Sequence, residues 1–153
     1  MKIILATDGS PCSEAAVMEV ARRPFPEDSE VRIISAFEPP APLTSEPWLS
    51  STSYFEEVER IEHEQARAAV EQAAARLREG QQNGELRITT QVLRGSPKRV
   101  IVEEAERWGA DLIVVGSHGL KSWERLLLGS VSQTVALHAP CSVEVVRRPA
   151  GKK

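Results

Sequence analysis

The stretch DLIVVGSHGLKSWERLLLGSVS, residues 111–132, decides how this sequence folds. Residues 111–115 are mostly apolar without polar alternation, which is typical of a strand buried on both faces of a sheet. The tetrapeptide GSHG, residues 116–119, follows directly, and nine residues separate it from GSVS, residues 129–132, where a helical pattern begins. The segment therefore predicts a buried strand, a glycine-rich loop and a helix, in that order.

This loop has the chemistry of a phosphate site. Glycines let a backbone come close to a phosphate and adopt positive φ angles. Ser130 can cap the helix that follows, whose free N–H groups and positive dipole end attract an anion. Ser130 and Ser132 could also donate hydrogen bonds from their hydroxyl groups. The same residues are equally suited to an ordinary turn and helix cap, so the spacing alone leaves both interpretations open.

The rest of the chain alternates apolar strands with helical patterns, which implies βαβ crossovers, a parallel sheet and helices on both faces. Ligands bind such sheets outside the carboxyl ends of the strands, where the strand order reverses. We therefore expect a site at the ends of the first, second, third and fourth strands of a single domain. The predicted strands are residues 3–6, 31–37, 86–93, 111–115 and 142–146.

Residues 39–53 hold four of the ten prolines and are predicted to form a loop, either a plain connector or a lid over a ligand. A long helix is predicted next, at residues 54–82, ended by Asn83-Gly84. Phe55, Ile61 and Leu77 belong to its apolar stripe, and its charged face is expected to be solvated.

Composition and charge exclude several classes of protein. Hydrophobic residues make up 41% and charged residues 27%, as in soluble globular proteins. The net charge of −3 gives no general electrostatic reason to bind nucleic acid or an anionic membrane, so an anionic ligand must be held by local groups. No apolar run reaches the roughly 20 residues of a membrane span, and the start shows no signal peptide, which favours the cytoplasm. Two cysteines are too few for a disulfide framework.

Three segments of the sequence resemble the universal stress protein family. The pattern G-x2-G-x9-G-[ST], formed by Gly116, Gly119, Gly129 and Ser130, resembles the ATP-binding signature of that family. ILATDGS, residues 4–10, resembles its first strand and loop, and APCSVEVVR, residues 139–147, its final strand. The resemblance implies a universal stress protein domain at residues 1–147 with a tail at 148–153. It also implies an adenine nucleotide alpha hydrolase-like α/β fold, with a five-stranded parallel sheet in the order 3-2-1-4-5.

The resemblance also implies which residues bind ATP. The backbone of Ala36 would meet the adenine edge, and Asp8 would lie near the ribose and phosphates. A carboxylate repels a polyphosphate, so Asp8 implies a bridging Mg²⁺ or a hydrogen bond to a ribose hydroxyl, unless it only caps the first turn. The implied binding residues are Ala6, Thr7, Asp8, Ala36, Gly116, His118, Gly119, Gly129, Ser130, Val131 and Ser132.

By this resemblance the chain is a regulatory, stress-response module that binds ATP, and it pairs as a homodimer through residues 142–146. The alternatives are a slow ATPase or nucleotidyl-transfer enzyme, or a binder of AMP or another adenylate, in the same pocket. Catalysis by His118 would need an orienting partner, which the sequence does not identify. An enzyme would also need a group that positions a water or an acceptor, and Glu38, which follows the second strand, could approach for that purpose. No motif identifies a protein partner.

Three further side chains have two interpretations each. Lys121 and Arg125 lie between the glycines and could reach phosphate oxygens or be solvated. Cys12 lies in the first turn of a helix and could serve redox chemistry or fill space as a small packing residue.

Overall fold

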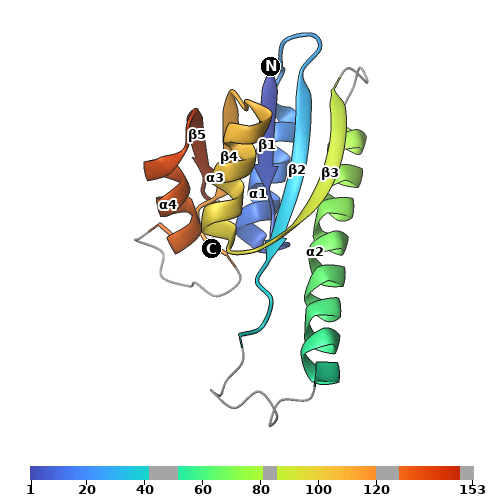
Figure 1. The fold of residues 1–153 in the computed structure, drawn as a ribbon. Coiled ribbons are helices and arrows are strands. Elements are labelled where there is room, and N and C mark those ends of the chain that lie inside the picture. The colour runs from blue at the N-terminus through green and yellow to red at the C-terminus, as the bar shows by residue number, and fades with distance from the viewer. Residues whose placement is uncertain (42–51, 81–85, 120–127, 149–153) are drawn as a thin grey trace, which may run out of the picture.

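The computed structural model describes residues 1–41, 52–80, 86–119 and 128–148. Its strands form one five-stranded parallel sheet in the order β3-β2-β1-β4-β5, as predicted. Because the strands are parallel, their carboxyl ends lie at one edge of the sheet (Figure 1). The strands are β1 (Lys2–Ala6), β2 (Glu30–Phe37), β3 (Arg87–Arg94), β4 (Leu112–Gly116) and β5 (Ser142–Val146).

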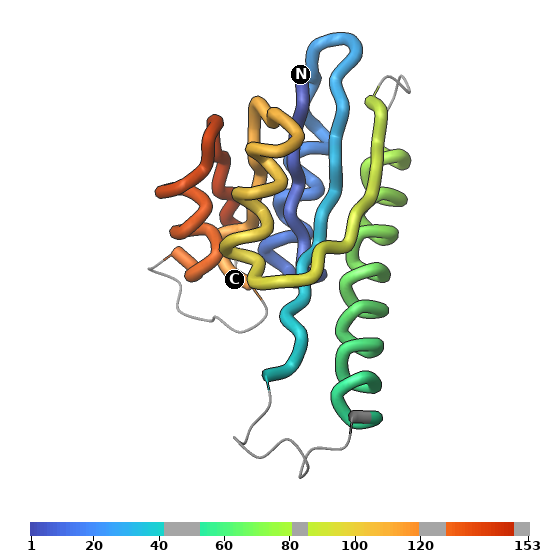
Figure 2. The backbone as a smooth tube through the Cα atoms, in the orientation of Figure 1, coloured from blue at the N-terminus to red at the C-terminus, as the bar shows by residue number. Residues whose placement is uncertain are grey.

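Helices cover both faces of this sheet. They are α1 (Pro11–Arg22), α2 (Thr52–Gly80), α3 (Pro97–Trp108) and α4 (Ser130–His138). Figures 1 and 2 show α1 and α2 on one face and α3 and α4 on the other. Each helix follows a strand and returns the chain to the start of the next one, so its amino terminus lies at the carboxyl edge of the sheet.

The central strand β1 shows why the apolar runs lack alternation. Ile3 and Leu5 pack with α1 and α2, whereas Ile4 packs on the opposite face with α3 and α4. All three side chains are fully buried. Burying an Ile or Leu side chain stabilises a fold by about 1.5–3 kcal/mol. Consecutive residues of β1 are therefore apolar because both faces of the sheet are covered.

A repeated Ser-Pro pair begins two of the helices. Ser10 is the N-cap of α1, its hydroxyl accepts a hydrogen bond from the N–H of Ser13 at 3.2 Å, and Pro11 is the first helical residue. Ser96 precedes Pro97 at the start of α3 in the same way, but its side chain makes no capping hydrogen bond. The pair therefore marks both helix starts correctly, while only the first serine acts as a side-chain cap.

The long helix α2 is described from Thr52 to Gly80, and its predicted end at residues 82–84 lies outside the described residues. The prediction that Ile61 belongs to a buried stripe is wrong, because its side chain is 42% exposed. Figure 1 shows that the amino-terminal part of α2 extends beyond the carboxyl edge of the sheet.

A buried ion pair joins β2 to α3. Glu104 is 4% exposed and accepts hydrogen bonds from Arg32 on β2 at 2.5 Å and from Arg107 at 2.7 Å. The Arg32 guanidinium also lies 4.1 Å from the centre of the Trp108 ring. A carboxylate this deeply buried needs such partners, because losing its hydration is costly. The pair fixes α3, and with it one wall of the site, against the sheet.

Candidate functional site

A cavity of about 440 Å³ opens at the carboxyl edge of the sheet, between the ends of β1, β2 and β4. The strand order reverses between β1 and β4, so this is where a parallel sheet is expected to bind a ligand. The structure brings all eleven residues of the implied ATP site to this one cavity, while their contact with a ligand stays a prediction. The other lining residues are Ser13, Ile34, Glu38, Ser96, Pro97, Lys98, Ile101 and Val115.

Gly116, at the end of β4, lies in close contact with the backbone at the start of α1. A Cβ atom at Gly116 would lie 2.6 Å from the carbonyl carbon of Cys12 and 2.7 Å from the backbone nitrogen of Ser13. Real Cβ atoms do not approach backbone atoms so closely, so only glycine fits here without moving α1. The glycine that the motif assigns to ligand contact therefore has a packing role as well.

Asp8 follows β1 and closes the turn that leads into α1, while Ser10 is the N-cap of that helix. Its Oδ1 accepts a hydrogen bond from the N–H of Ser10 at 2.9 Å. Its Oδ2 lies beside the glycine loop, 2.7 Å from where a Cβ of Gly119 would stand. The hydrogen bond with Ser10 uses one carboxylate oxygen, and contact of Asp8 with a ligand stays a prediction.

The start of α4 corrects one expectation. Ser130 was expected to cap this helix, but Gly129 is the N-cap and Ser130 is the first helical residue, with an exposed side chain. Gly129 is the N-cap because its N–H donates a hydrogen bond to the carbonyl of Ser117 at 2.7 Å. This bond fixes the chain at Gly129, one residue before the expected cap at Ser130. The N–H groups of the first helical turn have no intrahelical partner and remain suited to an anion.

Ser132 has a structural bond that the sequence did not reveal. Its hydroxyl is buried and lies 3.0 Å from the carbonyl oxygen of Ser117 and 2.9 Å from that of Gly129. The single hydroxyl hydrogen is therefore used within the joint between loop and helix. Donation from this hydroxyl to a phosphate stays a prediction, which requires the hydroxyl to turn away from these carbonyls, and the backbone N–H in the first turn is a second candidate for phosphate contact.

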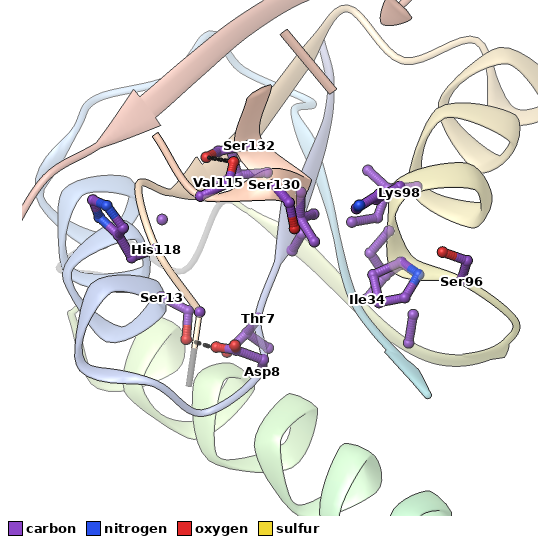
Figure 3. Close-up of a pocket in the computed structure, with 18 of the residues that line it drawn as sticks. Thr7, Asp8, Ser13, Ile34, Ser96, Lys98, Val115, His118, Ser130 and Ser132 are labelled. Carbon is purple, nitrogen blue, oxygen red and sulfur yellow. Dashed lines mark hydrogen bonds between the residues drawn. The ribbon is translucent and has the colours of Figure 1, made fainter. Parts of the chain in front are cut away.

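His118 forms the loop hydrogen bond that was one of its expected roles. Its Nδ1 lies 3.1 Å from the hydroxyl of Ser117, and its carbonyl accepts a hydrogen bond from Ser10 at 3.4 Å. Figure 3 shows its ring toward α1, away from Lys98 and Ser96. Within the described residues the Nε2 atom is buried without a hydrogen-bond partner, and no carboxylate orients the ring.

The opposite wall of the cavity was missed by sequence reasoning. Ile34 of β2 and Ile101 of α3 give it an apolar surface, and Lys98 stands on it near the start of α3 (Figure 3). The signal that could have found this wall is the second Ser-Pro pair, which starts α3 at the same edge as the glycine loop. Glu38, which the sequence suggested could approach, does line the cavity.

Several expectations concern residues outside the described ranges. Lys121 and Arg125 lie in the segment 120–127, and most of the proposed lid lies in 42–51, so the structure does not address them. Cys12 and Cys141 are free and partly buried. Burial raises the pKa of the Cys141 thiol, and the nearby charge of Asp111 raises it further.

The sequence model described as the Universal stress protein family matches residues 1–147. The chain belongs to that family. Its curated relatives include Universal stress protein MJ0531 of Methanocaldococcus jannaschii, which is 34% identical over 148 residues, 97% of this chain and 82% of the relative.

Solved structures share the fold. Universal stress protein UspA from Lactobacillus plantarum is 26% identical with a TM-score of 0.78, covering 96% of this chain and 97% of the other. Another universal stress protein, solved in complex with cAMP, is 25% identical with a TM-score of 0.64 and covers 96% of each chain.

The described ranges of the chain hold no ready-made metal site. No group of three or more His, Cys, Asp or Glu side chains in those ranges could hold a metal ion. A cation beside Asp8 would therefore take most of its ligands from phosphate oxygens and water. None of the helices in the same part of the chain is long and apolar enough to span a membrane.

The packing role of Gly116 gives a stability prediction. Gly116→Ala should lower the free energy of unfolding by about 1–3 kcal/mol, because its Cβ meets immovable backbone of α1. Gly119→Ala is the matched control and should lose less than about 1 kcal/mol, since its Cβ meets a carboxylate that can rotate. Urea unfolding measures both, and equal losses would contradict the packing role of Gly116.

Proposed function

We propose that this universal stress protein binds an adenine nucleotide, with ATP as the main ligand, and works as a nucleotide-dependent regulatory module. The observation that carries the proposal is the convergence of Asp8, Gly119 and the start of α4 on one cavity at the switch point of the sheet. A phosphate chain suits the polar side of this cavity, and an aromatic base suits its apolar side.

The phosphates would lie on the first turn of α4. The backbone N–H groups of Ser130, Val131 and Ser132 begin that helix, so they and the helix dipole favour an anion. The exposed hydroxyl of Ser130 can donate a further hydrogen bond. These backbone and hydroxyl groups can bind phosphate without a lysine side chain.

The base would lie against Ile34 and Ile101, with the backbone of Ala36 at its edge. These residues line the same cavity as the helix start, and the two isoleucines provide apolar contact. Apolar walls with few polar groups are typical of small-molecule sites. The size of the cavity, about 440 Å³, falls within the usual range of about 300–1,000 Å³ for such sites.

A second candidate ligand is a cyclic or single-phosphate adenylate. The universal stress protein that was solved with cAMP favours it, because that chain is similar to this one over 96% of each length. The phosphate-binding turn of α4 would serve one phosphate as well as three. Titration of ATP, AMP and cAMP against the same protein sample separates the two candidates by their dissociation constants.

The first test reverses the charge at the start of α4. Ser130→Glu should weaken ATP binding by at least about tenfold, because a carboxylate would lie where the phosphates bind. The fold should not suffer, since an acidic residue in the first turn of a helix is favourable. Isothermal titration calorimetry gives the affinity, and thermal unfolding gives the stability.

Gln133→Glu is the matched control for this test. Gln133 is exposed on the same helix and is not among the residues that line the cavity. Its change to glutamate adds the same negative charge as Ser130→Glu. The Gln133→Glu variant should lose clearly less ATP affinity than Ser130→Glu, because its new carboxylate stands outside the cavity and faces water. ATP binding that is unchanged in Ser130→Glu would contradict the proposed phosphate position.

The second test concerns Asp8 and Mg²⁺. We propose that the cation bridges Asp8 and the phosphates, so Asp8→Asn should weaken ATP binding when Mg²⁺ is present. Without Mg²⁺ the same change should strengthen binding, because it removes a repelling charge. Asparagine can still accept the hydrogen bond from Ser10, which keeps the turn intact. Calorimetry in both buffers measures the effects, and a change of the same sign in both would refute the bridge.

We also propose that the chain forms a homodimer through β5. This strand pairs with β4 on one side, and within the described residues no strand covers its other side. Val143, Val145 and Val146 are only partly buried there, and an uncovered apolar edge strand tends to find a partner. Light scattering should give twice the chain mass of 16.8 kDa, whereas a particle of single-chain mass would contradict the dimer.

A further inference from the structure

Lys98 is a cation on the wall of the cavity that the family motif does not include. It follows Pro97 as the second residue of α3, and it lines the cavity together with Ser130 of α4. Figure 3 shows the two side chains entering the pocket from different helices. The sequence gives it this place because Ser96-Pro97 begins α3 at the carboxyl edge of the sheet.

The neighbouring arginines differ from Lys98 because each has a carboxylate partner. Arg94 pairs with Glu59 at 2.7 Å, and Arg99 pairs with Glu103 at 2.8 Å. Lys98 forms no salt bridge with any residue in the described ranges. Its ammonium group therefore faces the cavity without a competing carboxylate bond from that part of the chain.

The starts of α3 and α4 flank the same cavity. Both helices pack on one face of the sheet, and both begin at its carboxyl edge. Their positive dipole ends therefore meet at the pocket, where Lys98 adds a full positive charge. An anion on the first turn of α4 would therefore be attracted by the two helix dipoles and by the Lys98 charge.

The lining carboxylates make this charge important. Asp8 and Glu38 line the cavity, and their negative charges oppose every added phosphate. Among the described residues that line the cavity, Lys98 is the only lysine or arginine. A lysine ammonium forms strong, charge-assisted hydrogen bonds to phosphate oxygens. Each further phosphate therefore gains from Lys98 part of what it loses to the two carboxylates.

We propose that Lys98 binds the phosphate chain of the nucleotide and makes the affinity of this pocket increase with the number of phosphates. The inference rests on the proposed function and adds a specificity-determining residue to it. It assigns to α3 a share in phosphate binding that the glycine motif alone does not describe. Lys98 touches the ligand through its ammonium group, and the apolar wall behind it holds the base.

The experiment compares ATP, ADP and AMP binding to the full chain and to Lys98→Gln by calorimetry in magnesium-free buffer. Lys98→Gln should weaken ATP binding about tenfold and AMP binding about twofold or less, with ADP between them. Lys98→Arg should keep most of the ATP affinity, because it keeps the charge. The thermal midpoint should not change, since Lys98 is exposed.

Arg99→Gln is the matched control. Arg99 is the next residue of α3 and is not among the residues that line the cavity. Its change to glutamine removes one positive charge, as Lys98→Gln does. Its variant should bind ATP within about twofold of the parent protein. If Lys98→Gln and Arg99→Gln lose the same amount of ATP affinity, the effect comes from the general charge of the protein and not from a contact of Lys98, which would overturn the inference.

Two other results would also overturn the role of Lys98. Unchanged ATP affinity in Lys98→Gln shows that the ammonium does not touch the phosphates. Equal weakening of ATP and AMP shows a contact with the base or ribose instead. In both cases nucleotide binding by the parent protein leaves the proposed function standing. If the parent protein binds none of the three nucleotides, the proposed function and this inference fall together.

Discussion

The contact between the start of α1 and Gly116 is the constraint on which the site depends. The backbone of α1 lies so close to the end of β4 that a Cβ atom at Gly116 would stand 2.6 Å from it. This contact fixes the end of β1 beside the glycine loop, so that Asp8 meets Gly119. The loop is then tied to α4, because the carbonyl of Ser117 accepts the N–H of Gly129 at 2.7 Å. Three segments far apart in sequence thereby form one side of a cavity.

The two sides of the cavity differ in polarity, and this difference determines which ligands suit it. One side presents the backbone N–H groups and the positive dipole end of α4, which suit phosphate. The other side presents Ile34 and Ile101, which suit a flat apolar base. The hydroxyl of Ser132, which the sequence suggested for binding, lies at hydrogen-bond distance from two backbone carbonyls. Phosphate recognition in this account therefore depends on the backbone of α4 together with the ammonium group of Lys98.

The sheet could be predicted from the sequence because its strands are short apolar runs separated by helical patterns. Residues 111–115 and the Ser-Pro pairs mark their elements by local rules, which need no knowledge of distant contacts. The eleven residues of the implied site also reach one cavity, since they follow the ends of neighbouring parallel strands or begin a helix there.

What could not be predicted depends on contacts between distant residues. The N-cap of α4 is Gly129 because of a carbonyl twelve residues earlier in the loop. Ile61 is exposed although it fits the apolar period of α2, because the period of a helix does not show which of its turns other elements cover. Glu104 is buried against Arg32, a partner 72 residues away in sequence. Lys98 looks like any surface lysine until α3 is packed beside the cavity.

The most direct test of the account is mass spectrometry of the small molecules released when the purified protein is heated. The account predicts that the parent protein releases an adenine nucleotide, mainly ATP, and that Ser130→Glu releases little or none. Release of mainly AMP or cAMP would assign the same pocket to a different adenylate. If neither protein releases an adenine nucleotide, and the parent protein does not bind ATP when it is added back, the claim that this cavity is a nucleotide site is wrong.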